Sequence, residues 1–335
     1  AFDLQISSIN NRNMSTSPTG SIKEIVPIYC EPVYTGNLHQ SAGERDCLYS
    51  STVFFSLLSM LMVLLMMCVF LGDMNTKGIV QVLEQYGGER NPVQDKENAL
   101  NLVQYWTLAG LMVVNALTVT LSVIGIMVGD ANENKLQSFF SAPVNRSVIA
   151  LSYITAAVLI GMMFCGITLG VALGYIYMSG GAMLSMGVIV QILGYTLMNV
   201  CIFAIIMYML ALFIKSSSAW GGIGTVVGTL VGFVGAIYLP MGDLPSRVAN
   251  VLKYIPILHG TSLMRKVCCE EAMQITFAGI SQEVIDVYQE HMGITVWMHG
   301  TEVSEIKQML FFFFFGVGAF IVIAILTKRK SISDR

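Results

Sequence analysis

Six long apolar runs constrain what this chain can fold into more than any other feature of its sequence. Crossing the hydrocarbon layer of a bilayer takes about 20 apolar residues in a helix, because lipid offers no hydrogen-bond partner to a bare backbone amide or carbonyl. The runs lie at Thr52–Gly72, Thr107–Gly129, Ser147–Met178, Met183–Ile214, Ala219–Leu239 and Ile306–Thr327. We therefore predict an all-α integral membrane protein with six transmembrane helices.

The composition agrees with a membrane environment and excludes several classes of function. Hydrophobic residues make up 55% of the chain and charged residues only 12%, whereas a soluble domain carries roughly a quarter charged residues. A formal net charge of -3 provides no basic surface for nucleic acid. The seven cysteines show neither zinc-site spacing nor a disulfide framework. We expect membrane lipid around the chain, no nucleic-acid partner, no metal and no cofactor bound to this chain.

Composition also divides the chain into segments. Residues 1–51 form a polar N-terminal tail, the end of which could lie on the membrane surface. Residues 52–330 hold the six spans, and residues 331–335 form a short C-terminal tail. Within the membrane domain, residues 73–106 are acidic and polar, and we expect a loop there. Residues 240–305 are too apolar for a simple linker, so we expect them to fold.

Basic residues beside the last apolar run predict the orientation. Lys328, Arg329 and Lys330 mark a cytoplasmic end, because short basic flanks resist translocation. An even number of spans then places both termini in the cytoplasm. We expect a multi-pass protein of the cell (plasma) membrane, of bacterial origin, with residues 240–305 on the outer side.

The polar connection between the second and third runs has the pattern of a short amphipathic helix. Leu136, Phe139 and Phe140 fall at helical spacing beside the charged Glu133, and Pro143 ends the pattern. Such a helix either rests on lipid headgroups or docks in a groove of another protein. The residue pattern alone does not separate these two interpretations.

Two groups of residues resemble a known family. The first group lies directly between the second and third apolar runs and consists of Asp130, Glu133, Leu136, Phe139, Pro143, Val144 and Arg146. The second group consists of residues 239–245, then Tyr254, Ile255, Pro256, His259 and Arg265. The first resembles the coupling-helix segment of type-2 exporter permeases of the ATP-binding-cassette superfamily. The second resembles the segment after that family's fifth helix, where the chain re-enters the outer leaflet as short helices.

The resemblance extends over residues 50–330 and implies partners for this chain. It implies a dimer of permease subunits, with a second copy or a paralogue, on nucleotide-binding ATPase subunits that hold ATP and Mg. The sequence has no Gly-x-x-x-x-Gly-Lys-Ser/Thr motif, so the phosphates of a nucleotide would bind to another chain. The chain would then be a subunit of an ATP-hydrolysing translocase and not itself an enzyme. The implied ATPase-coupling residues are Glu133, Leu136, Phe139, Phe140, Pro143 and Arg146.

Two rows of glycine leave helix faces bare. Gly224, Gly228 and Gly232 lie four residues apart in the fifth run, which permits close approach of another helix. Either packing within the subunit or a subunit interface would explain the spacing, and the resemblance favours the interface. A similar row occurs in the third run, and we interpret it as packing within one subunit. Its members are Gly166, Gly170 and Gly174.

Uncharged polar residues mark one face of two spans. No Asp, Glu, Lys or Arg lies in the middle of any apolar run, so the charged relay of many secondary transporters is not visible. Hydrogen bonding between helices is the interpretation we favour for the uncharged polar residues, and lining of a transport pathway is the other. The candidates for such a lining are Asn115, Thr118, Ser122, Gln191 and Asn199.

Together these observations predict the permease subunit of an ATP-driven exporter. It would move a hydrophobic or amphipathic substrate, such as a drug, peptide, lipid or glycan, out of the cytoplasm by alternating access. The alternative is an ATPase-independent secondary transporter or channel. We expect a structural role for His259. Cys268 and Cys269 should lie outside the membrane, and we assign them no chemistry. The phenylalanine rings of residues 311–315 should face lipid.

Overall fold

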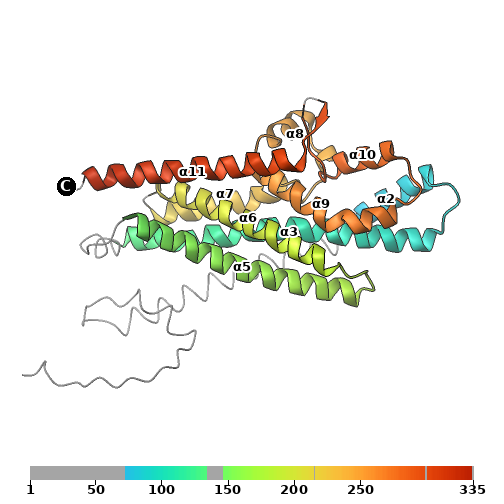
Figure 1. Ribbon diagram of the computed structural model, residues 1–335, viewed down its shortest axis with the longest axis horizontal. Helices are drawn as coiled ribbons and strands as arrows, with labels where there is room; N and C mark the ends of the chain where they lie inside the picture. Colours follow the sequence, from blue (N-terminus) through green and yellow to red (C-terminus); the bar gives the residue numbers. More distant parts are fainter. Residues whose placement is uncertain (1–71, 134–145, 215, 299, 334–335) are drawn as a thin grey trace, which may run out of the picture. The chain divides into compact units, whose positions relative to one another are not determined.

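The computed structural model describes residues 72–133, 146–214, 216–298 and 300–333 (Figure 1). All of these residues belong to the second of two compact units of the chain, Thr52–Arg335. The predicted tail at residues 1–51 lies outside the described residues. So does the first predicted span, Thr52–Gly72, apart from Gly72 itself.

Five helices of the described part are long and apolar enough to cross a membrane. They are α3 (Pro92–Asn132), α5 (Arg146–Met178), α6 (Met186–Ala211), α7 (Ser217–Val234) and α11 (Glu305–Ser333). They run alongside one another in Figure 1 and match the second to sixth predicted spans. The prediction of an all-α membrane protein is confirmed.

Shorter elements surround the long helices. They are α2 (Gly72–Tyr86), the 3-10 turn η4 (Met241–Asp243), α8 (Ser246–Leu252), α9 (Pro256–Thr276), α10 (Gln282–His291) and the strands β1 (Trp297–Met298) and β2 (Thr301–Glu302). The two strands form an antiparallel hairpin in which Trp297 pairs with Glu302. Residues 240–305 therefore fold, as their composition predicted.

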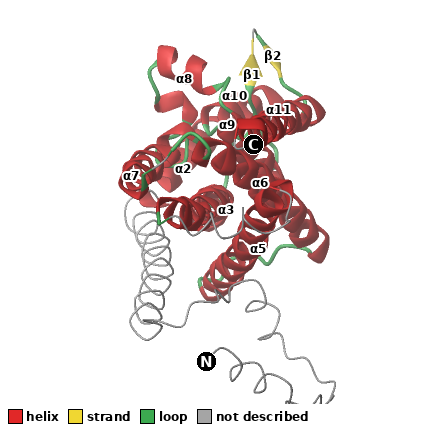
Figure 2. Cartoon of the chain, turned by 90° about the vertical axis from the view of Figure 1, so that its left-hand side faces the viewer, coloured by secondary structure: helices red, strands yellow, loops and turns green. Residues whose placement is uncertain are grey.

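The helix α3 lies at the centre of the described bundle. It begins after Asn91, whose side-chain oxygen accepts a hydrogen bond from the Val93 amide at 3.1 Å, and Pro92 occupies its first turn. It packs against α2, α5, α6, α7 and α9, and Figure 2 shows it among these helices. A helix that is apolar around its whole circumference suits this position.

The predicted loop at residues 73–106 was wrong, because these residues are largely helical. Helix α2 and the first turns of α3 occupy most of the segment. Ile79 and Leu83 are buried in the main core while many polar neighbours face outward, so a polar composition hides an amphipathic helix. Asp95 is buried as well, and both of its carboxylate oxygens accept hydrogen bonds from Arg90 Nε at 3.0 Å.

The ends of two spans also differ from the prediction. Helix α7 ends at Val234 and not at Leu239, because the chain turns there. The amides of Ile237 and Tyr238 both donate to the Gly232 carbonyl, at 2.7 and 3.0 Å. At the other end of the chain, α11 continues to Ser333, past the predicted limit of the last span and into the segment expected as a tail.

A buried arginine connects four separate segments. Arg265 of α9 is fully buried, and its guanidinium donates to the carbonyls of Ala236 (2.7 Å), Met292 (3.1 Å) and Gly293 (3.3 Å). Its Cζ atom lies 4.1 Å from the ring centroid of Trp106, whose Nε1 donates to the Met292 carbonyl at 2.8 Å. Desolvation lowers the pKa of Arg265 to about 9. This group joins α9 to α3, to the turn after α7 and to the end of α10.

Candidate functional site

The connection between α3 and α5 contains the predicted ATPase-coupling segment. Glu133 caps the end of α3 and is exposed, and Arg146 begins α5. The remaining predicted coupling residues lie outside the described residues. They are Leu136, Phe139, Phe140 and Pro143. The structure therefore describes the two helices on either side of the segment.

A hydrogen bond joins α3 and α5 next to this connection. Tyr153 Oη donates to Asp130 Oδ2 at 2.8 Å, and both side chains are partly buried. The two helices also pack against each other at many other positions. Displacing the connection would therefore move the ends of α3 and α5 together.

The polar side chains predicted to share one face of the second span all form hydrogen bonds within the protein. Asn115 is buried, and its Nδ2 donates to Thr168 Oγ1 of α5 at 2.7 Å. Thr118 Oγ1 donates to the Val114 carbonyl and Ser122 Oγ to the Thr118 carbonyl, each at 2.9 Å within α3. These side chains bond to their own helix or to a neighbouring one.

The two polar candidates of the fourth span lie in different surroundings. Asn199 is buried, and its Nδ2 donates to the Tyr195 carbonyl at 2.9 Å. Its Oδ1 lies so close to Gly260 of α9 that a Cβ atom there would be only 2.3 Å away. Gln191, in contrast, is exposed and lines a cavity. Asn199 thus lies at a close contact between α6 and α9, and Gln191 faces open space.

The glycine row of α7 does not act as one unit. A Cβ atom on Gly232 would meet the Tyr238 ring at 2.2 Å, so this glycine is needed for packing within the chain. At Gly224 the nearest atom would be Leu121 Cδ2 at 3.8 Å, and at Gly228 no described atom lies within 4 Å. Only the first two glycines leave room for another helix.

The glycine row of α5 faces away from the described bundle. Gly166, Gly170 and Gly174 are exposed, and no described atom lies within 4 Å of a Cβ built on any of them. We expected this row to pack within one subunit, and the described residues provide no such packing. Spacing alone does not show which face of a helix its neighbours cover.

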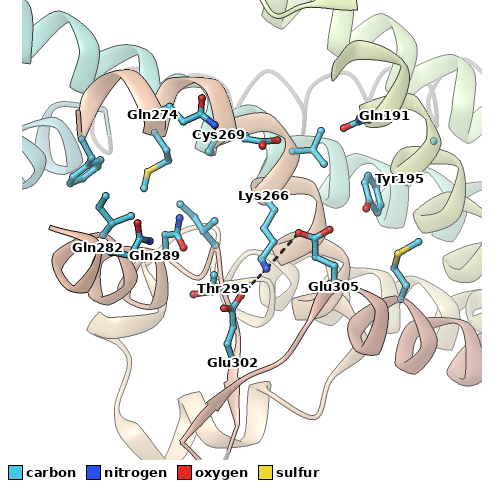
Figure 3. Close-up of a pocket in the computed structure, with 18 of the residues that line it drawn as sticks. Gln191, Tyr195, Lys266, Cys269, Gln274, Gln282, Gln289, Thr295, Glu302 and Glu305 are labelled. Carbon is cyan, nitrogen blue, oxygen red and sulfur yellow. Dashed lines mark hydrogen bonds and ion pairs between the residues drawn. The ribbon is translucent and has the colours of Figure 1, made fainter. Parts of the chain in front are cut away.

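A cavity of about 910 Å³ opens beside α9. Its walls come from α6, α9, α10, the β2 strand and the start of α11, as Figure 3 shows. Lys266 Nζ lies 2.8 Å from Glu302 Oε1 and 3.7 Å from Glu305 Oε1. Four glutamines also line the cavity, namely Gln191, Gln274, Gln282 and Gln289. The cavity thus combines charged and amide groups with an apolar wall.

A comparison with protein families identifies the chain. The model of a family described as "ABC-2 family transporter protein" matches residues 84–326, from the last turn of α2 into α11. The chain belongs to the ABC-2 transporter family. No curated protein matches this ABC-2 permease significantly. The predicted resemblance to exporter permeases of this superfamily is confirmed.

Membership of the ABC-2 transporter family indicates the general role of this permease. It is a multi-pass membrane protein and the permease component of an ATP-binding-cassette transporter, which associates with an ATPase subunit. The matched region includes both helices next to the predicted coupling segment and every residue that lines the large cavity. Among the residues with a described position, no group of three His, Cys, Asp or Glu side chains is placed to hold a metal ion.

The cavity of this ABC-2 permease was not predicted from the sequence. Of its lining residues, only Gln191 was a candidate site residue. Lys266 and Glu302 are 36 positions apart and come from different elements. The local signal for this cavity was the charge of Glu302 and Glu305 next to the last apolar run. Charged residues are common at membrane boundaries, so this signal does not indicate a binding site.

The structure also shows the burial and contacts of the remaining residues that were singled out from the sequence. His259 is buried, its Nε2 lies 2.9 Å from the Lys253 carbonyl, and its ring centroid is 4.7 Å from that of Phe311. Cys268 and Cys269 are buried free thiols of α9. Four of the five consecutive phenylalanines at residues 311–315 are exposed, and Phe312 is fully buried in the core.

Proposed function

We propose that this ABC-2 permease is the membrane subunit of an ATP-driven exporter. It moves a hydrophobic or amphipathic cargo out of the cytoplasm by alternating access, and ATP and Mg bind to the separate ATPase subunit. The coupling helix lies within residues 130–146, at the connection between α3 and α5, and transmits the motion of the ATPase. Six spans, including Thr52–Gly72, cross the membrane, and both termini lie in the cytoplasm.

The observation that carries this proposal is the joined pair of helices beside the coupling segment. The Tyr153–Asp130 hydrogen bond of 2.8 Å ties α3 to α5 next to the connection. The Asn115–Thr168 hydrogen bond of 2.7 Å ties the same two helices further along. Because α3 also touches four other helices, a displacement of the connection would reach most of the bundle. This arrangement suits a permease driven through a mechanical contact.

The proposed dimer uses the face of α7 that the described residues leave uncovered. Gly224 and Gly228 have space for the backbone of another helix, whereas Gly232 is occupied by Tyr238 of the same chain. Small residues let helices approach closely in a membrane, where packing is a main source of association. A second copy of the chain, or a paralogue, would occupy this face.

The experiment that tests the coupling role removes two rings from the segment. In the double variant Phe139→Ala and Phe140→Ala, we expect the permease to insert normally but to copurify poorly with the ATPase subunit that the wild type retains. Central aromatic anchors often contribute about 2 kcal/mol or more to an interface, which corresponds to a roughly thirtyfold loss of binding. Transport-dependent ATP hydrolysis should fall with it.

A matched control is available on α11. The double variant Phe313→Ala and Phe314→Ala also removes two neighbouring rings, and both are exposed on a helix that is not part of the connection. It should keep the ATPase subunit. If the coupling variant binds and drives its ATPase as the wild type does, residues 130–146 only rest on lipid and the coupling proposal is wrong. Because nucleotide is cytoplasmic, a loss of binding would also support the proposed orientation.

A further inference from the structure

The large cavity beside α9 has an acidic lining. Its charged residues are Lys266, Glu270, Glu302 and Glu305, one base against three acids. The Lys266 side chain is only 18% exposed and already lies 2.8 Å from Glu302 and 3.7 Å from Glu305. Glu270, one turn further along α9, is exposed. After Lys266 is paired, the lining still has an excess of negative charge, which favours a positively charged ligand.

A hydroxyl group in the same cavity lacks a partner. Thr295 is only 6% exposed, and its Oγ1 has no hydrogen-bond partner among the described residues. Its side chain lines the large cavity and also a smaller one of about 260 Å³ next to it. Figure 3 shows it near Lys266 and Glu302. Buried hydroxyls in native proteins are nearly always hydrogen-bonded, so this one points to a polar group that enters the cavity.

Apolar side chains also line the cavity. They include Met273 of α9, Phe277 directly after α9, Ile285 of α10 and Met309 of α11. Small-molecule sites combine such an apolar wall with a few polar groups that fix the orientation of the ligand, in volumes of about 300 to 1,000 Å³. The cavity, at about 910 Å³, lies within this range. A ligand that satisfies both kinds of side chain carries a charged end and an apolar body.

We propose that this cavity binds a small organic cation, an amine with an apolar body. The ammonium group lies among the carboxylates of Glu270, Glu302 and Glu305 and donates a hydrogen bond to the hydroxyl oxygen of Thr295. The apolar body packs against Met273 and neighbouring side chains. Lys266 competes with the ligand for the glutamates, because both are cations. This assignment concerns binding to the permease alone and does not depend on the export proposal.

Matched probes of one shape test the charge preference. We would titrate the purified full-length permease with 3-phenylpropylammonium, with the anion 3-phenylpropanoate and with the neutral 3-phenylpropan-1-ol, by calorimetry against protein-free micelles. Charge-assisted hydrogen bonds are about twice as strong as neutral ones, so the cation should bind at least about tenfold more tightly than either analogue. Equal affinity for the cation and the anion would overturn the proposal.

Variants locate the binding to this cavity. Glu302→Gln should weaken cation binding about tenfold, whereas Glu283→Gln, an exposed residue of α10 that does not line the cavity, should leave it unchanged. Thr295→Val should weaken it severalfold without lowering the Tm, because the hydroxyl has no partner to lose. Lys266→Met should strengthen it severalfold by freeing the carboxylates.

The Lys266 variant separates a binding role from a structural one. A variant that merely damaged the fold would not bind the cation more tightly. If Lys266→Met does not fold, the Glu302 and Thr295 variants decide the question, since both conserve side-chain size. Unchanged affinity in Glu302→Gln and Thr295→Val would place the cation elsewhere and overturn the assignment.

Discussion

The helices α3 and α7 are both apolar and long enough to span a membrane, yet they are covered to very different extents. Within the most hydrophobic 18 residues of each helix, 78% are buried in α3 and 17% in α7. Helix α3 touches five other helices, whereas α7 touches mainly α3. Trp220 is the main anchor of α7, and it lies so close to Gly125 of α3 that a Cβ there would be 2.6 Å from its Nε1.

This difference shows what hydropathy does and does not report. The hydropathy of a segment indicates whether the segment can lie in lipid. It does not indicate whether its neighbours are lipid or other helices of the protein. Helix α3 meets protein over most of its circumference, so its side chains are subject to close packing. The described residues leave the outer face of α7 uncovered, so it can meet lipid or a second subunit. Substitutions that are costly in α3 should therefore be mild in α7 unless another chain covers it.

The largest expected effect is at Trp106 of α3. This side chain is 1% exposed, stacks on Arg265 and donates to the Met292 carbonyl. Trp106→Ala should destabilise the permease by about 3–5 kcal/mol and lower the Tm by at least about 5 °C in a thermal unfolding assay. Leu230→Ala on the exposed side of α7 should cost less than about 0.5 kcal/mol. Equal losses would show that α7 is as closely packed as α3.

A smaller effect is expected from adding one methyl group to a glycine of each helix. A Cβ on Gly110 of α3 would lie 2.8 Å from Cγ2 of Ile237, a buried β-branched residue that cannot rotate away. Gly110→Ala should therefore cost about 1–3 kcal/mol, measured as a lower Tm. Gly228→Ala on α7 should not destabilise the isolated subunit, because no described atom lies within 4 Å of the added group.

A larger side chain at the same α7 position separates lipid from a second subunit. Gly228→Leu should leave the Tm of the monomer unchanged but reduce crosslinking and the dimer fraction in detergent, because the backbone of another helix can no longer approach. A dimer that persists with this substitution would place the subunit interface elsewhere.

The smallest effect concerns a hydrogen bond between spans. Thr168→Val removes the acceptor of the Asn115 amide of α3 and should cost about 0.6 kcal/mol, the average measured for such bonds between membrane helices. The control is Thr229→Val on α7, where the hydroxyl is exposed and bonds only to its own helix. A Tm change in the control equal to that of Thr168→Val would contradict the comparison.

The sequence was sufficient to locate the five described spans, because the signal of an apolar run is local. The predicted runs Ser147–Met178 and Met183–Ile214 differ from α5 and α6 by only a few residues at each end. It was insufficient for α2, where Ile79 and Leu83 form a narrow apolar stripe in a mostly polar segment. A hydropathy average does not distinguish such a stripe from a loop.

The cavity and the buried arginine could not be predicted, because both depend on distant segments. Arg265 was named from the sequence only as part of the family resemblance, and only the fold brings the carbonyls of Ala236 and Met292 to it. Likewise Lys266, Thr295 and Glu302 are ordinary in their own sequence neighbourhoods. Asn115 was easier, because an amide inside an apolar run requires a partner wherever the fold places it.

The surroundings of Arg265 have a consequence for the order of events during synthesis. Two of its three carbonyl partners, Met292 and Gly293, are made after it, 27 and 28 residues further along the chain. Until Met292 and Gly293 emerge from the ribosome, their carbonyls cannot replace the water molecules that hydrate the Arg265 guanidinium. Burying the guanidinium without these hydrogen bonds would be costly. We therefore expect α9 to pack against Trp106 only after α10 and the two residues that follow it have been synthesised. Until then Arg265 stays hydrated, so the packing of α9 depends on a segment that is C-terminal to it.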